Sequence, residues 1–199
     1  MGLFGPSKKE VWTQLCRETQ SKLVDKGFWK GSKVEHKHRA WLLVLDEYTV
    51  STGKSSVTYT RIRVPYVPKQ PFTFQISRSG LFSGMAKLLG AQDIETGDAV
   101  FDEAYVVKSD DDWQVRRLLD NEELRALLLL QKYFNLHNRQ PMAIFRESLP
   151  VGAEQMEFQI TGVIRKVEVL KDLFSILCMV LDGLCAMDAI TNAGVDMDY

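Results

Sequence analysis

Cysteine is scarce in this chain, which has three in 199 residues: Cys16, Cys178 and Cys185. No two of them form a CxxC pair, and an odd number cannot all be joined in disulfides. The disulfide framework of a small secreted protein therefore does not fit this sequence, and a reducing compartment is favoured. We expect the protein to be cytoplasmic, either free or at the membrane surface.

Long apolar runs are also missing. The first residues, MGLFGPS, lack the basic segment followed by an apolar stretch that marks a signal peptide. The most apolar stretch, residues 173–187, contains Asp182 and is shorter than the roughly 20 apolar residues that cross a bilayer. We therefore expect no transmembrane segment, and we interpret this stretch as part of a buried helix.

Net charge is small, with 25 Lys and Arg against 26 Asp and Glu, but the two signs are unevenly distributed. Residues 1–90 hold 15 basic and 6 acidic residues, whereas residues 91–199 hold 10 basic and 20 acidic residues. Such a division cancels where the two halves interleave in one fold, or it leaves a basic face that attracts an anionic partner. Both outcomes are open at this point.

Hydrophobic patterning predicts helices at both ends of the chain. Ser7 and Glu10 form a capping-box signature, and apolar residues then recur at helical spacing over residues 8–26. Residues 165–187 carry a second, wider apolar stripe, which packs either against a sheet or against a second copy in a homodimer. Shorter helices are expected at residues 81–89, after the acidic residues 110–112, and again from Asn121.

Segments between these helices predict strands. They are residues 33–45, 57–67, 72–77, 105–108, 134–145 and 154–163, with a hairpin turn at 51–56 and prolines at 65, 68 and 71 that end a strand or confine it to an edge. We expect an α+β fold in which an antiparallel sheet of about five or six strands is packed by the N-terminal and long C-terminal helices. Residues 1–190 form the single domain, and residues 191–199 form a flexible acidic tail.

Basic residues in the first half are interleaved with tryptophan and tyrosine. Those assigned to a partner-binding basic face are Lys33, Lys37, Arg39, Arg61, Arg63, Lys69 and Arg78. Such a face suits lipid headgroups or an acidic protein. Nucleic acid is disfavoured, because the isoelectric point is about 6.3 and no nucleic-acid-binding signature is present.

Metal, nucleotide and cofactor sites have little support. His36 and His38 lie on the same face of the strand predicted at residues 33–45, as two metal ligands can, but a third ligand is not in reach. Gly53-Lys54-Ser55 ends like a phosphate-binding loop, yet Tyr48 stands where the opening glycine belongs and a strand follows. We expect no cofactor and no metal, with His36 and His38 as the candidates if a metal binds.

Catalytic groups are similarly sparse. The acidic residues between 93 and 103 can share a cation or transfer protons, but turn formation and helix capping also account for them. The three cysteines lie on apolar helix faces, where a thiol stays protonated and unreactive. An enzyme that uses the acidic loop 93–103 is therefore kept as an alternative only.

One stretch resembles a known family. The loop Gly97-Asp98-Ala99-Val100-Phe101-Asp102 leads into a strand, then into residues 110–112 and the helix residues 115–119. This arrangement resembles uncharacterised bacterial domains of unknown function with a Gly-Asp-x-x-Phe-Asp loop before a strand and an acidic-capped helix. Residues 2–12 and 48–56 are similar to those of small Gram-positive members. The resemblance covers about residues 1–187, and it implies a soluble bacterial protein without supplying an activity.

These observations favour a non-catalytic binding or scaffolding protein whose basic face meets an anionic partner. The alternative from another class is a carrier of an apolar small molecule, held in a cavity between the sheet and the C-terminal helix. The third is the enzyme using the acidic loop.

Overall fold

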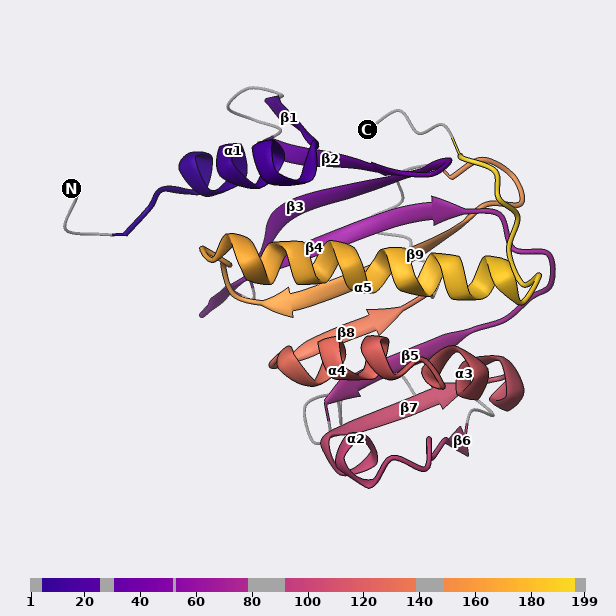
Figure 1. Cartoon of the computed structure of the whole chain (residues 1–199). Coiled ribbons are helices and arrows are strands. Elements are labelled where there is room, and N and C mark those ends of the chain that lie inside the picture. Colours follow the sequence, from indigo (N-terminus) through magenta and orange to yellow (C-terminus); the bar gives the residue numbers. More distant parts are fainter. Residues whose placement is uncertain (1–4, 26–30, 52, 79–91, 139–148, 196–199) are drawn as a thin grey trace.

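The computed structural model describes residues 5–25, 31–51, 53–78, 92–138 and 149–195. Within these residues a single antiparallel sheet carries helices on one face (Figure 1). This confirms the predicted α+β class with N-terminal and long C-terminal helices. The sheet has nine strands in the order β1-β2-β3-β4-β9-β8-β5-β7-β6, which is more than the five or six expected.

The first half of the chain forms one helix and five strands. They are α1 (Lys8–Thr19), β1 (Lys22–Asp25), β2 (Ser32–His38), β3 (Trp41–Ser51), β4 (Ser56–Tyr66) and β5 (Phe74–Arg78). The predicted capping box is present, because the Glu10 carboxylate accepts the Ser7 N–H and the Ser7 hydroxyl accepts the Glu10 N–H. The helix ends before the expected residue 26, since Gln20 turns left-handed and β1 pairs with β2.

Residues 33–45 form two strands and not the single one expected. The chain reverses at Arg39, which adopts a left-handed conformation with φ of 51°. This reversal changes which residues share a face, so that Leu45 and Leu43 of β3 lie opposite Val34 and His36 of β2. The alternation in this stretch is compatible with one strand, because the turn residues Arg39 and Ala40 include no glycine that would mark the reversal.

The second half supplies four strands and four helices. They are β6 (Gln92–Asp93), α2 (Ala99–Ala104), β7 (Tyr105–Ser109), α3 (Asp112–Leu119), α4 (Glu122–Leu130), β8 (Phe134–His137), β9 (Glu154–Thr161) and α5 (Val167–Ala186). Asp111 caps α3 and Asn121 caps α4, which confirms the acidic helix start and the restart. The helix expected at 81–89 and the strand expected over 139–145 lie outside the described residues.

Strand order divides the sheet into two ends. Strands β1 to β4 are neighbours at one end, and β5 leaves them to pair with β8 and β7 at the other. Pro65 lies inside β4, contrary to the expected edge position, opposite Gln155 of the central strand β9. It is tolerated because the register between β3 and β4 runs only as far as Val44 and Arg63.

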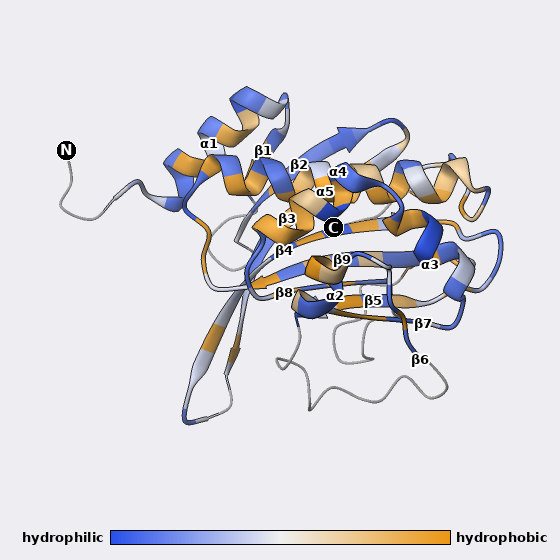
Figure 2. Cartoon of the chain, turned by 60° about the horizontal axis from the view of Figure 1, so that its bottom comes forward, coloured by the Kyte–Doolittle hydropathy of each residue, from blue (hydrophilic) through white to orange (hydrophobic). Residues whose placement is uncertain are grey.

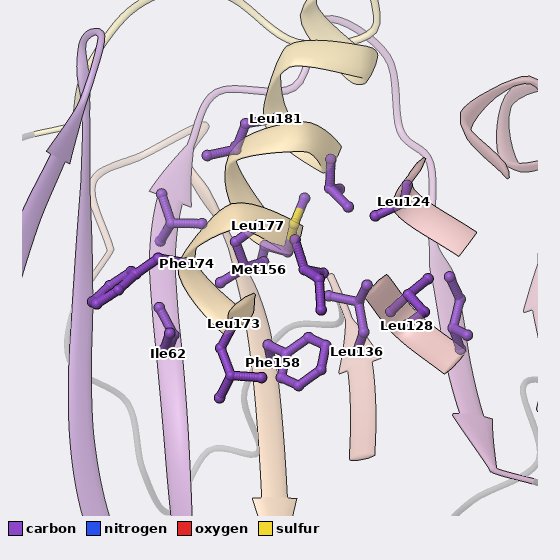
Figure 3. Packing of buried hydrophobic residues seen from close by; sticks show 14 of the residues in the cluster. Ile62, Leu124, Leu128, Leu136, Met156, Phe158, Leu173, Phe174, Leu177 and Leu181 are labelled. Carbon is purple, nitrogen blue, oxygen red and sulfur yellow. The ribbon is translucent and has the colours of Figure 1, made fainter. Parts of the chain in front are cut away.

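Helix α5 lies across the middle of the sheet and contacts α1, α3 and α4 (Figure 1). Its apolar stripe packs on β4 and β9, where Leu173 and Leu177 lie against Ile62 and Phe158 (Figure 3). The stripe is therefore used inside the chain, and a homodimer through this helix stays a prediction. No helix in the described part of the chain is long and apolar enough to span a membrane.

After α5 the chain passes over the end of β4. The Lys69 N–H donates to the Ala189 carbonyl and the Thr191 N–H donates to the Val67 carbonyl, both at 2.9 Å. Gly194 then lies so close to Ala40 that a Cβ would stand 2.2 Å from its carbonyl oxygen. Residues 191–194 of the expected tail follow this path, and residues 196–199 lie outside the described part.

Candidate functional site

The face of the sheet opposite the described helices carries many polar side chains. Residues paired directly across antiparallel strands point to the same face. Following the registers from strand to strand, one row contains Glu35, Val44, Arg63, Glu157, His137, Gln75, Lys108 and Asp93. The next row contains Asp46, Arg61, Gln159, Asn135, Ser77 and the apolar Val106. We call these two lines of side chains the polar rows.

An ion cluster occupies the centre of the polar rows. Asp46 accepts from Arg61 Nε at 2.7 Å and from Arg63 Nη2 at 2.6 Å. Glu157 lies 3.7 Å from Arg61 Nη1. Arg61 also stacks over the Tyr48 ring, 4.4 Å from its centroid. The cluster pairs each charge with an opposite one, as a structural ion network does.

Burial changes the acidity of two groups at this cluster. It raises the pKa of Glu157, and the nearby Arg61 and Arg63 offset this only in part. It also raises the pKa of Tyr48 to about 12, so that the hydroxyl stays protonated and donates to Gln159 Oε1 at 2.8 Å. Both effects have the same cause, since removing water disfavours the charged form of an acid.

Replacing Glu157 by glutamine should stabilise the protein at neutral pH. A carboxyl whose pKa is raised in the folded state contributes most below its ordinary value of 4.5 and loses that contribution as pH rises through the folded pKa. The advantage of the glutamine variant in urea unfolding should therefore be larger at pH 7 than at acidic pH. The exposed control Glu123→Gln should change the free energy of unfolding by at most about 0.5 kcal/mol at either pH. A Glu157→Gln variant that is less stable than wild type at neutral pH would contradict this.

The seven residues assigned to the basic face do not form one surface. Lys33, Lys37, Arg61 and Arg63 share the face of β2 and β4 that is opposite the described helices. Most of the set is paired within the chain: Lys33 with Glu35, Arg39 with Asp182, Arg61 and Arg63 with Asp46, and Lys69 with Asp188. Arg78 lies over the Tyr133 ring, and Lys37 is exposed. Partner binding by this set stays a prediction.

His36 and His38 lie on the helix-facing side, as the shared face predicted. His36 Nδ1 bonds the Ser21 hydroxyl at 2.9 Å, and His38 Nε2 bonds Asp182 at 2.9 Å. Burial lowers the pKa of His36, whose ring lies 4.8 Å from that of Phe174. Among the described residues, no three His, Cys, Asp or Glu side chains come together as metal ligands.

The acidic loop 93–103 is held by backbone and basic groups. Asp98 caps α2 and pairs with Arg125 at 3.1 Å, and the Phe101 N–H is the main cause of the lowered pKa of Asp98. Asp102 accepts the Thr96 N–H at 2.8 Å and the Gly97 N–H at 3.0 Å. These contacts are those of a capped turn, and a carboxyl with a lowered pKa is a poor proton donor at neutral pH.

The space that a carrier would need under α5 is filled by side chains. Leu173 and Leu177 of α5 reach Met156 and Phe158 of β9 (Figure 3), and all four are fully buried. Three hollows in the described part lie elsewhere. They measure about 320 Å³ between α3 and the end of α5, 520 Å³ on the outer side of α1, and 320 Å³ beside residues 68–71.

Charge is separated along the sheet. Residues 1–66, which include α1 and β1 to β4, hold 12 basic and 6 acidic residues. Residues 92–133, which include α2, α3, α4 and the edge strands β6 and β7, hold 5 basic and 11 acidic residues. The two halves still interleave in part, because β9 and α5 of the second half pack against β4 and α1 of the first. There Glu157 pairs with Arg61 and Asp182 pairs with Arg39. The exposed cations of the basic end that form no salt bridge with a described residue are Lys9, Arg17, Lys22, Lys37 and Lys54.

The end of the β3–β4 hairpin projects from the body of the sheet (Figure 2). We call residues 48–51 and 53–59 the ribbon. Neighbouring strands stop at its base, since the registers with β2 and β9 reach Leu45 and Tyr59. Val50 and Val57 on the ribbon are 37% and 38% exposed. The expected turn at 51–56 is confirmed. How far the hairpin projects depends on where the neighbouring strands β2 and β9 end.

Comparison with known proteins identifies the architecture. No protein-family model matches the chain, and no curated protein matches it. Among solved structures, the crystal structure of the mycobacterial trehalose monomycolate transport factor A, TtfA, is similar with a TM-score of 0.54 and 9% identity. The match covers 87% of this chain and 92% of that chain. At this identity, the likeness shows that the two chains share a fold.

Proposed function

We propose that the chain is a non-catalytic binding or scaffolding protein that holds an acidic protein partner at the basic end of its sheet. The supporting observation is the separation of charge between the β1–β4 end and the α2–α4 end. An acidic surface is attracted to the first and repelled by the second, which orients the partner before contact. The similarity to a transport factor is compatible with a binding role and does not identify a ligand.

A protein suits this end better than a lipid surface does. Lys9 lies on α1, whereas Lys37 lies on the face of β2 opposite the described helices, so a flat membrane meets only one of them at a time. A protein partner that wraps the end of the sheet can contact both lysines.

Membership of the bacterial family with the Gly-Asp-x-x-Phe-Asp loop is part of this proposal. Its support is local, because Asp98 and Asp102 of that loop make the capping contacts described above. A cytoplasmic location accords with the cysteine content and stays a prediction.

Reversing two exposed charges at the basic end should weaken binding of an acidic probe. We expect Lys9→Glu/Lys22→Glu to bind a poly-glutamate peptide about tenfold less tightly than wild type, since each exposed pair contributes up to about 1 kcal/mol. Fluorescence anisotropy of the labelled peptide measures this. The control Arg117→Glu/Lys132→Glu makes the same net-charge change at the acidic end and should have a much smaller effect.

Three results would count against the proposal. Equal losses in both variants would mean that net charge alone matters. If the protein does not bind poly-glutamate at low salt, the proposal of an acidic partner is contradicted. Binding that is confined to vesicles containing phosphatidylserine, compared with phosphatidylcholine alone, would identify a membrane as the anionic surface.

A further inference from the structure

The two outer edges of the sheet are protected, whereas the edge of the ribbon is open. Strand β1 has four residues with charges at both ends, Lys22 and Asp25, and β6 has two residues ending in Asp93. Short, charged edge strands are the usual protection against unwanted strand pairing. The β3 side of the ribbon, Tyr48 to Ser51, has no charged residue and no proline.

Backbone directions in the ribbon follow from one hydrogen bond. The Gly162 N–H donates to the Thr58 carbonyl at 2.7 Å, so the backbone groups of Thr58 point away from β3. Thr49 is directly opposite Thr58 and therefore belongs to a non-hydrogen-bonded pair. The N–H and C=O of Thr49, and of Ser51 two residues later, point away from β4. Within the described ranges no strand is paired with this side of β3 beyond Leu45.

We propose that the outer edge of β3, from Thr49 to Ser51, receives an extended segment of the partner protein as an added strand. Backbone hydrogen bonds supply affinity in this mode of recognition, and side chains supply specificity. Threonine, valine and serine on the ribbon suit a β-branched, uncharged segment. The proposal deepens the proposed function, from which it takes an acidic partner, and adds the way in which that partner is held.

Charge around the ribbon specifies acidic residues at the flanks of the added segment. At its base, Glu47 is paired with Lys8 and Arg165. Asp46 and Glu157 are paired with Arg61 and Arg63, so four cations face three carboxylates. Lys54 lies at the tip. A second copy of the chain fits poorly, because antiparallel pairing of two ribbons would place the Lys54 of each near the positive base of the other.

A proline at position 49 tests the proposal. Because the Thr49 N–H points away from β4, Thr49→Pro removes an outward donor and leaves the β3–β4 ladder intact. The probe is a synthetic peptide of alternating valine and threonine between glutamates. We expect Thr49→Pro to weaken its binding about tenfold or more, whereas Thr49→Val, which keeps the N–H, should stay within about twofold of wild type.

A second form of the probe keeps the test independent of any effect of proline on folding. The same peptide with N-methylated central amides has equal charge but cannot add as a strand, and it should lose binding to the wild-type protein. Equal binding of both peptides, or of wild type and Thr49→Pro, would overturn strand addition. If Lys9→Glu/Lys22→Glu still weakens that binding, the proposed function survives. A wild-type dimer that Thr49→Pro abolishes would show that the occupant is a second copy.

Discussion

Phe158→Ala is expected to destabilise the fold by about 3–5 kcal/mol, the usual cost of removing a buried phenylalanine side chain. Phe158 is fully buried at the centre of β9. Its ring stacks on Phe134 with centroids 4.9 Å apart, and it lies beneath Leu173 and Leu177 of α5 (Figure 3). Removing the ring leaves a cavity between the sheet and its central helix, which neither element can close without moving the other.

Urea unfolding measures this loss, with two controls. Phe158→Leu retains much of the volume and should cost clearly less than alanine. Val151→Ala, at a side chain that is fully exposed, should change stability by no more than about 0.5 kcal/mol. A loss below about 1.5 kcal/mol for Phe158→Ala would mean that the space under α5 is not tightly packed. Such a result would support the cavity between the sheet and α5 that the carrier hypothesis requires.

Elements governed by local patterns were predictable from the sequence. The C-terminal helix was expected at residues 165–187 and spans Val167–Ala186, because its apolar stripe repeats over five turns. The capping residues Ser7, Asp111 and Asn121 act as expected, since a cap depends on residues only three positions away.

Elements that depend on distant partners were less predictable. Strand β1 contains only four residues, and its pairing with β2 overrides the helical pattern that continues past Thr19. The turn at Arg39 has no glycine to mark it, so two strands resembled one. Strand β6 has two residues, and so short an element has no period to detect.

The candidate site was predictable in its charges but not in its contacts. Uneven charge between the two halves could be counted from the sequence. The sequence did not show that β9 and α5 bring Glu157 to Arg61 and Asp182 to Arg39. The pairing of Arg61 and Arg63 with Asp46 depends on the register of the β3–β4 hairpin. The approach of Glu157 to Arg61 could not be foreseen, because Glu157 comes about a hundred residues later and faces β4 only through its register with β9. The exposure of the ribbon also depends on distant residues, because it is determined by where β2 and β9 end.

Asp46→Ala is expected to destabilise the protein by about 2–4 kcal/mol, because it removes the carboxylate that two arginines share. The side chains of Asp46, Arg61 and Arg63 are only 19%, 17% and 7% exposed, so water can replace that carboxylate only in part. Urea unfolding again measures the loss. The control is Asp93→Ala, whose carboxylate pairs with Lys108 at 3.3 Å but is 72% exposed, and which should cost at most about 1 kcal/mol.

The stability of the Asp46 variant also decides whether Arg61 and Arg63, on the face opposite the described helices, can bind a partner. Arginines that depend on Asp46 for stability are committed to the sheet, and a partner could recruit them only by first breaking a buried pair. Binding would then rely on exposed cations such as Lys9, Lys22 and Lys37. If Asp46→Ala costs no more than Asp93→Ala, the cluster is effectively solvated, and Arg61 and Arg63 become available to an anionic partner as the sequence alone suggested.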